Sequence, residues 1–287
     1  MGVVAIIAGL ALIGLLPGSA SAALPSSKTI SVGAGRVGIT IRTSNVTLDG
    51  YRITGPQYGH YRSSEIGILV AGTASAPVRN VTIRNCVITR FGYAAIVLRY
   101  VENFRIENCH IRNAVYAGVM VISGTTGMIR DNLIQRIGVV GYQTMEMNSY
   151  GIALTDEGGA VSAGIKVISN TIEDVPQWHG IDTHGGRRIE ITANTIRRTN
   201  RAIFITTTTQ GRRSADITVS KNWMSDPTRR VDVLHRYPYN EYGITVYRAD
   251  RVTGTLNGFD GWPRGNQLNV TGSTAVSITH HRLYHPT

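Results

Sequence analysis

The sequence predicts an all-β fold, a right-handed single-stranded parallel β-helix in which three sheets form a solenoid with an asparagine ladder. Three observations lead to this prediction. A phrase ending in Asn recurs along the chain, a second phrase starting with a small residue recurs between its copies, and neither phrase has helical periodicity. The composition agrees, because Gly is abundant at 32 residues and aromatic residues make up only 7%.

The first phrase is a short apolar strand that ends in Asn and is followed by another apolar pair, as in VTIRNCVI at 81–88. Its six Asn residues are 23, 24, 38, 24 and 28 positions apart. Strands in successive coils pair about 4.8 Å apart, so equivalent Asn side chains can hydrogen-bond to one another and to the turn backbone. We therefore predict a structural ladder made of Asn85, Asn108, Asn132, Asn170, Asn194 and Asn222.

The second phrase is a small residue followed by alternating apolar positions, as in GILV at 67–70 and GVMV at 118–121. Alternation in a strand sends successive side chains to opposite faces. We expect the apolar positions to point inward and the intervening positions to face solvent.

Two cysteines follow consecutive ladder Asn residues. Cys86 and Cys109 are therefore expected to be inward neighbours one coil apart. In-register parallel neighbours are a poor geometry for a disulfide, and we predict two buried free thiols.

The N-terminus differs from the repeats. Val3 to Leu16 is almost unbroken apolar sequence, and Ala20-Ser21-Ala22 has the small-x-small form of a cleavage site. We interpret residues 1–22 as a signal peptide and expect a secreted or periplasmic protein. Residues 23–287 then form one β-helix domain, with regular coils over about 40–255 and an irregular C-terminal coil over 256–287.

The charge balance favours an anionic partner. Lys and Arg total 29 against 18 Asp and Glu, a formal net charge of +11. Export and the lack of a nucleic-acid-binding motif argue against nucleic acid. No later segment is long and apolar enough for a membrane span. An acidic polysaccharide fits both the charge and the compartment, because Arg pairs with carboxylates in bidentate fashion.

One coil departs from the apolar pattern. Asp182 and His184 occupy outward positions two residues apart, with the small neighbours Thr155 and Thr206 in adjacent coils. A carboxylate beside an imidazole fixes its tautomer and raises its basicity, which suits proton transfer. We predict Asp182, His184 and His179 as catalytic residues; the alternative is a surface hydrogen bond that caps a turn. The pair would equally suit two ligands of a metal ion, but a third and fourth ligand are not evident, so the cofactor stays open, with Ca²⁺ as a candidate.

The connections that lead into this sheet vary in length at 55–65, 138–149 and 225–241. They are rich in Tyr, His and Arg, which stack on sugars and bind carboxylates. Long loops on one side of a repeat stack commonly form its binding side. The predicted substrate-binding residues are Glu157, Trp178, Arg201, Arg229, Arg230, His235, Arg236, Tyr237, Tyr247 and Arg248.

With its Asn ladder, the chain resembles the pectate-lyase-like superfamily over roughly residues 40–255. Within it, 179–184 is similar to the segment Tyr-Gly-x-Asp-Pro-His of mannuronan C-5 epimerases. Gly180, Asp182 and His184 match that segment, His179 replaces its Tyr and Thr183 its Pro. The acidic residue expected one coil later falls at Thr206. The resemblance implies abstraction of the C5 proton of a uronate while a cation neutralises its carboxylate.

Three functions remain open from the sequence. The first is an exported enzyme that acts on an acidic, uronate-containing polysaccharide as a lyase or epimerase. The second is a glycoside hydrolase that pairs Asp182 with Glu157 or Asp156. The third is a non-catalytic glycan-binding or structural β-helix protein, in which the Asp–His pair is incidental.

Overall fold

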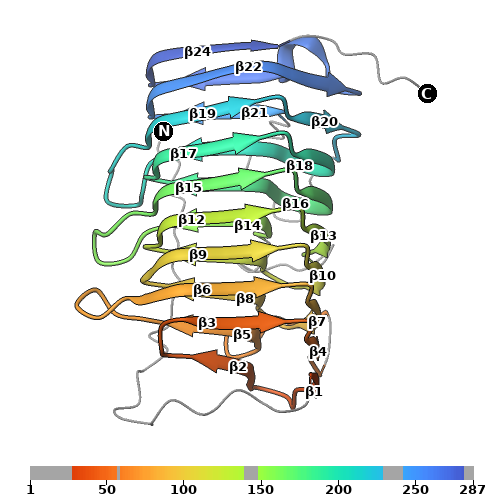
Figure 1. Cartoon of the computed structure of the whole chain (residues 1–287). Coiled ribbons are helices and arrows are strands. Elements are labelled where there is room, and N and C mark those ends of the chain that lie inside the picture. The colour runs from red at the N-terminus through yellow and green to blue at the C-terminus, as the bar shows by residue number, and fades with distance from the viewer. Residues whose placement is uncertain (1–27, 57–58, 139–147, 229–241, 281–287) are drawn as a thin grey trace.

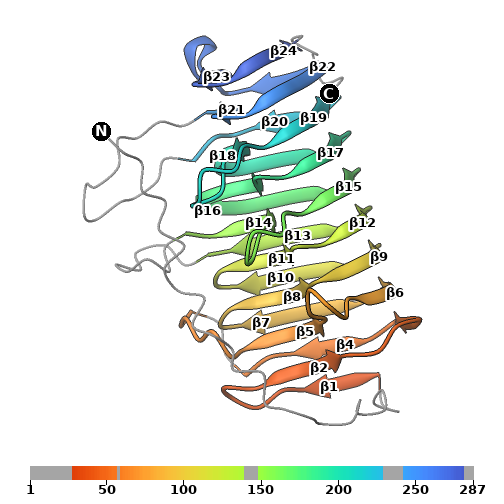
Figure 2. The ribbon, with the colours of Figure 1, turned by 90° about the vertical axis from the view of Figure 1, so that its left-hand side faces the viewer.

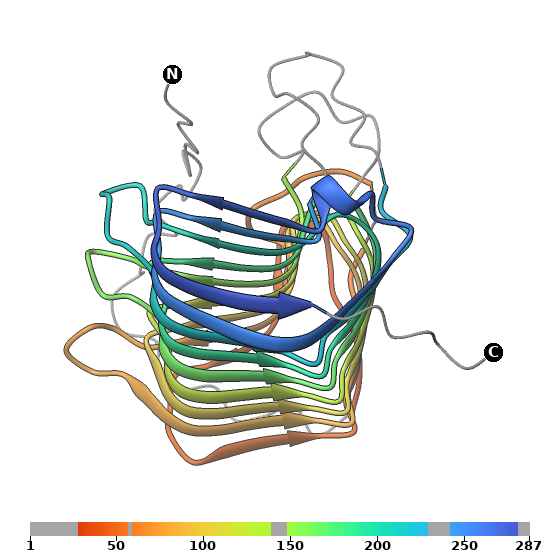
Figure 3. The same cartoon turned by 90° about the horizontal axis from the view of Figure 1, so that it is seen from above.

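The computed structural model describes residues 28–56, 59–138, 148–228 and 242–280. These form a stack of coils in which each strand pairs in parallel with its counterpart one coil away, as Figures 1 and 2 show. Seen along the axis in Figure 3, every coil has three sides. The predicted signal peptide, 1–22, lies outside the described residues. Within the described ranges, no helix is long and apolar enough to cross a membrane.

The first face of the solenoid contains the strand segment with Asp182 and His184. It consists of β2 (Val37–Ile41), β5 (Ile66–Ala71), β8 (Ala94–Arg99), β11 (Ala117–Ile122), β14 (Tyr150–Thr155), the C-terminal halves of β16 (Thr171–His184) and β18 (Thr195–Thr206), β21 (Ile244–Tyr247) and β23 (Leu268–Thr271).

The second face follows the first along the chain. It consists of β3 (Val46–Asp49), β6 (Val78–Arg84), β9 (Val101–Glu107), β12 (Thr125–Arg130), β15 (Ala163–Ile168), β17 (Arg187–Thr192), β19 (Ala215–Ser220), the first part of β22 (Asp250–Asp260) and β24 (Thr274–His280).

The third face closes each coil. It consists of β1 (Thr29–Ser31), β4 (Arg52–Thr54), β7 (Val87–Phe91), β10 (His110–Ala114), β13 (Leu133–Ile137), the N-terminal halves of β16 and β18, β20 (Trp223–Ser225) and the end of β22. A short 3-10 helix, η2 (Arg264–Asn266), precedes β23.

Inward β-branched and Leu side chains fill the interior. On the first face, Ile96, Val119, Ile152, Ile181 and Ile203 pair in register from coil to coil and are fully buried. These apolar ladders explain why the second sequence phrase repeats. The inward side chain of each coil packs against the equivalent side chain of the preceding coil, so each coil needs an apolar residue there.

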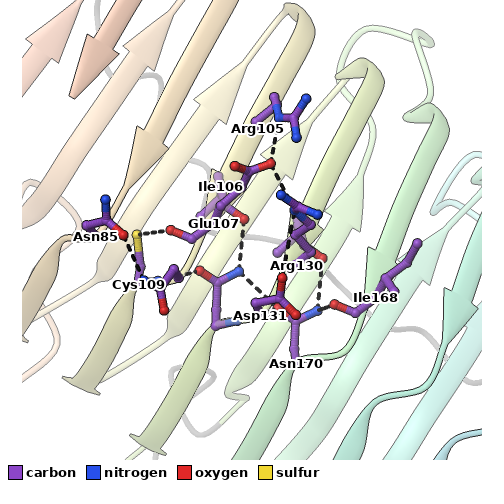
Figure 4. Close-up of polar contacts among 12 residues, drawn as sticks. Asn85, Arg105, Ile106, Glu107, Cys109, Arg130, Asp131, Ile168 and Asn170 are labelled. Atoms are coloured by element: carbon purple, nitrogen blue, oxygen red, sulfur yellow. Dashed lines mark hydrogen bonds and ion pairs between the residues drawn. The ribbon is translucent and has the colours of Figure 1, made fainter. Parts of the chain in front are cut away.

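The asparagine ladder runs inside the bend between the second and third faces (Figure 4). The Asn132 side-chain amide donates to the Ile106 carbonyl at 3.0 Å and to Oδ1 of Asn170 at 2.9 Å. Its own Oδ1 accepts the backbone N–H of Cys109 at 2.9 Å. The pattern continues through Asn194, Asn222 and Asn257, all buried. The ladder therefore satisfies backbone groups where strand pairing is interrupted.

The prediction for Asn85 and Asn108 is wrong by one residue. The register of β7 with β10 and β13 places Cys86 and Cys109 level with Asn132, so the thiols occupy the inward position. Asn85 and Asn108 lie one residue earlier, exposed, with φ of 55° and 50°, and Asn108 donates to Asn85 at 2.7 Å. Asn tolerates this left-handed conformation better than most residues, which explains its presence at both positions.

Both thiols are buried and free, as the sequence predicted. The Sγ atoms of Cys86 and Cys109 each lie near the carbonyl two residues earlier, those of Arg84 at 3.2 Å and Glu107 at 3.3 Å. They extend the inward column that the Asn side chains form above them.

Candidate active site

A bend at Gly180 positions the side chains of His179 and Asp182. A Cβ on Gly180 would lie 2.7 Å from both the Ala202 carbonyl oxygen and Cγ2 of Ile196, so the position requires a very small residue. The chain turns here from the third face onto the first, and the β16–β18 register shifts between Val175 and His179. His179 and Asp182, three residues apart, consequently meet on the outward side of the coil.

Asp182 is held between two histidines. Nδ1 of His179 lies 2.5 Å from Oδ2 of Asp182 in a hydrogen bond. Nε2 of His184 lies 3.1 Å from the same oxygen, as a close ion pair without hydrogen-bond geometry. His179 and Asp182 are fully buried, and His184 is 4% exposed. The expectation that these outward positions face solvent is therefore wrong, although the side chains do point away from the core.

Outward positions in the preceding coils of the first face are also buried, not exposed to solvent. The outward residues Leu69, Val97, Met120 and Ala153 form a buried apolar cluster on the first face. Strand alternation correctly predicts which side chains point outward, but it does not predict which residues cover them.

Burial and mutual charge set the protonation states. Burial, together with the charges of Arg201 and His184, lowers the pKa of His179 to about 4 against the opposing effect of Asp182. Burial disfavours the ionised form of Asp182, but the charges of His184 and His179 and the hydrogen bond with His179 hold its pKa well below the usual range. Burial acts against the charge on His184, yet Asp182 and Asp156 raise its pKa.

At neutral pH the group therefore contains a neutral His179 and a carboxylate at Asp182, while the raised pKa of His184 favours its protonated form. Because Nδ1–H of His179 donates to Asp182, its Nε2 carries the lone pair. Nη1 of Arg201 lies 3.2 Å from that Nε2 and donates to it. His179 thus has the arrangement of an oriented base, whereas His184 is occupied by Asp182 and by the backbone of Thr207.

Aromatic rings surround this base. The Trp178 ring stacks on His179 at a centroid distance of 4.5 Å, and Phe204 from the next coil lies equally close. The Arg201 guanidinium lies 5.3 Å from the centroids of both Trp178 and Phe204. Trp178, Phe204 and Arg201 are half-buried, so the site is most accessible on this side.

Tyr150 and Phe204 were not predicted as site residues. Tyr150 pairs in register with His179 and contacts its ring edge-on at 5.8 Å. Phe204 pairs with Asp182. The repeat contains a signal for both: Phe204 occupies the position equivalent to Asp182 in the next coil, and Tyr150 precedes the small residue of its coil as His179 precedes Gly180.

Three predicted binding residues, Glu157, Tyr247 and Arg248, contact other partners than His179, Asp182 and His184. Glu157 forms a bidentate ion pair with Arg99. Tyr247, at the end of β21, stacks with the Arg248 guanidinium at 5.3 Å. Arg229, Arg230, His235, Arg236 and Tyr237 lie outside the described residues. Among the described residues, no group of three or more His, Cys, Asp or Glu side chains is arranged to hold a metal ion.

The pairing of the strands and the coil-wise ladder define the protein as a parallel β-helix solenoid. The chain belongs to the family described as right handed beta helix region, whose profile matches residues 26–196 and 67–282. This confirms the predicted fold class. No curated protein matches the sequence.

Several solved structures have the same fold. DFA-IIIase from Arthrobacter chlorophenolicus A6, in complex with GF2, matches with a TM-score of 0.58 and 12% identity over 86% of this chain and 60% of that one. Tailspike protein 2 of the Escherichia coli O157:H7 bacteriophage CAB120 matches with a TM-score of 0.57 and 16% identity, over 89% and 34%. Polygalacturonase from Erwinia carotovora ssp. carotovora matches with a TM-score of 0.51 and 14% identity, over 90% and 74%.

The chain spans less than two thirds of the length of the first two of these structures. At such identities the likeness shows the fold alone, and the same scaffold supports unrelated functions.

Proposed function

We propose that the protein is an exported enzyme that abstracts the C5 proton of a uronate residue in an acidic polysaccharide. His179 is the base, Asp182 orients it, and Arg201 binds the substrate carboxylate. The observation that carries the proposal is the 2.5 Å contact between Nδ1 of His179 and Asp182, which directs the lone pair on Nε2 toward Arg201.

The arrangement suits this chemistry. When Nε2 of His179 takes the C5 proton, the electron pair of the C–H bond moves onto the carboxylate group of the sugar. A guanidinium beside that carboxylate stabilises the charge as it develops. In a lyase, the electrons then form a C4–C5 double bond while the C4–O4 bond breaks, and the departing O4 takes up a proton. In an epimerase, C5 instead takes up a proton on the opposite face.

Other features support the substrate class. The net charge of +11 favours an anionic polymer, and one structure of the same fold is by name a polygalacturonase. The resemblance to the pectate-lyase-like superfamily and to mannuronan C-5 epimerases supports a role for Asp182. That resemblance makes His184 catalytic as well, but the contacts of His184 favour an assisting role beside the base His179. The predicted signal peptide at 1–22 supports export to meet such a polymer.

A glycoside hydrolase is the second candidate. Hydrolysis uses one protonated and one ionised carboxyl group. Burial raises the pKa of Asp156, and the charges around Asp182 lower its pKa, so this pair has the required contrast. Glu157, the other proposed partner, is less suitable because Arg99 occupies its carboxylate.

A panel of uronate polymers tests both candidates. Ultraviolet absorbance of an unsaturated product detects a lyase, NMR of the intact polymer detects epimerisation, and new reducing ends without that absorbance detect hydrolysis. We expect wild type to act in one of the first two assays and a His179→Gln, Asp182→Asn double variant to be inactive in all three.

The matched control is His110→Gln on the third face, where His110 hydrogen-bonds to Gln135. It should behave like wild type. If wild type and the double variant behave identically in every assay, the catalytic proposal is wrong. Unchanged retention of the polymer by the double variant would then favour a glycan-binding protein.

A further inference from the structure

Arg201 covers the nitrogen that the proposed base must use. Nη1 of Arg201 donates to Nε2 of His179 across 3.2 Å, and His179 itself is fully buried. A lone pair that accepts a hydrogen bond from a cation is a poor acceptor for a second proton. In this structure, Asp182 therefore orients His179, whereas Arg201 masks it: the hydrogen bond from Arg201 occupies the Nε2 lone pair that would accept a proton.

The surroundings of Arg201 allow it to be redirected. Its guanidinium lies over the rings of both Trp178 and Phe204, 5.3 Å from each centroid. Contact with aromatic faces restricts the plane of a guanidinium more than the direction of its N–H groups. Arg201 can thus turn its donors from His179 toward an incoming group without leaving these rings.

A carboxylate is the group that can take these donors. Arg–carboxylate hydrogen bonds are charge-assisted, frequently bidentate and roughly twice as strong as neutral ones. A neutral ester or hydroxyl offers no comparable exchange for the bond to His179. The exchange also removes a positive charge from the lone pair of the base.

We propose that the substrate carboxylate draws Arg201 away from His179 and so unmasks the base, which makes proton abstraction dependent on an acidic sugar. The proposal rests on the proposed function and deepens it. Arg201 becomes the residue that determines specificity for free uronate over its neutral ester.

Within the part of the chain that the structure describes, few charged or titratable groups surround His179. Asp182 and His184 face it from its own strand, and Arg201 from β18. Tyr150 from β14 contacts its ring, and burial keeps that phenol neutral by raising its pKa. Asp156 acts on His184. Of these groups, Arg201 is the one that we expect a ligand carboxylate to move.

NMR titration of His179 with and without bound ligand tests this proposal. The His179 signal is assigned by comparison with His179→Gln, and the probe is a set of oligouronates that have no unsaturated end. We expect the pKa of His179 to rise when the oligouronate binds to wild type. In Arg201→Gln it should already be higher without ligand and respond less to binding. Arg90→Gln, an exposed residue on the third face, is the matched control and should respond like wild type.

Binding without any change at His179 would overturn the unmasking and leave the proposed function standing. Absence of binding to every uronate tested would overturn both. As an independent readout, the preference of wild type for a free-acid polymer over its methyl ester should fall by at least about 10-fold in Arg201→Gln. An unchanged preference would contradict the role of Arg201 in specificity.

Discussion

Nδ1 of His179 lies 2.5 Å from Oδ2 of Asp182, and both side chains are fully buried. A buried carboxylate is costly unless charged or hydrogen-bonding partners compensate it. Here the second partner is His184, 3.1 Å from the same oxygen, while Oδ1 of Asp182 has no hydrogen-bond partner among the described residues. A protein that only needed stability would gain little from this arrangement, which favours a role in proton transfer.

Replacing Asp182 should separate orientation from folding. In Asp182→Asn the amide no longer fixes the proton on Nδ1 of His179 and no longer balances His184. We expect turnover to fall on the order of 100-fold or more, as when the orienting carboxylate of a base is removed. Steady-state kinetics with circular dichroism of the variant checks this. A folded variant with wild-type turnover would contradict the orienting role.

The stability of the protein should depend on pH through His179. Its pKa falls from 6.5 to about 4 in the folded state, chiefly through burial. The unfolded chain then binds more protons between these values, so this contribution to stability is complete above about pH 6.5 and lost as pH falls to about 4.

Denaturant unfolding of wild type and His179→Gln across this range measures the effect. The difference in unfolding free energy between them should shrink as pH falls. The raised pKa of His184 acts in the opposite direction and above pH 6.5, because its stabilising charge is lost as pH rises through that pKa. A constant difference between the two proteins would show that His179 titrates normally.

The asparagine ladder gives a prediction with an internal control. Asn132→Leu removes a buried amide bonded to Ile106, Asn170 and Cys109, and should cost about 1–3 kcal/mol of unfolding free energy. Asn108→Gly keeps the left-handed backbone and removes only an exposed contact, so the change should stay within about 0.5 kcal/mol. Equal losses in the two variants would mean that the register is not as described.

The bend at Gly180 gives a further matched pair. Gly180→Ala places a methyl group 2.7 Å from the Ala202 carbonyl and should cost about 1–3 kcal/mol while also shifting His179. A Cβ on Gly265 has no atom within 4 Å, so Gly265→Ala should be nearly neutral. Thermal unfolding and activity of both variants test this; an intact, fully active Gly180→Ala protein would argue against the bend as the positioning element.

Sequence periodicity predicts the fold and most of the coil alignment. Ala153, Asp182 and Phe204 fall in one column, as strand pairing confirms. The alignment is wrong at Asn85 and Asn108 because Asn suits two adjacent positions of the bend, one left-handed and exposed, the other inward and bonded. The residue type alone does not separate these positions.

The site was only partly predictable for a different reason. Strict alternation pairs Asp182 with His184, since both are outward and two residues apart. The closer contact, between Asp182 and His179, depends on the bend at Gly180, which interrupts the alternation. Burial of the outer face also depends on which residues cover it, and strand pattern carries no information on that.

The most direct test of the central claim is hydrogen exchange at C5. Uronate polymer is incubated with the protein in deuterated water, and NMR measures deuterium at C5 in polymer and products. We predict enzyme-dependent incorporation at C5, or loss of the C5 proton on elimination, with wild type and the His110→Gln control, and neither with His179→Gln. Conversion of the polymer with the C5 proton retained, or wild-type exchange by His179→Gln, would contradict the assignment of His179 as the base.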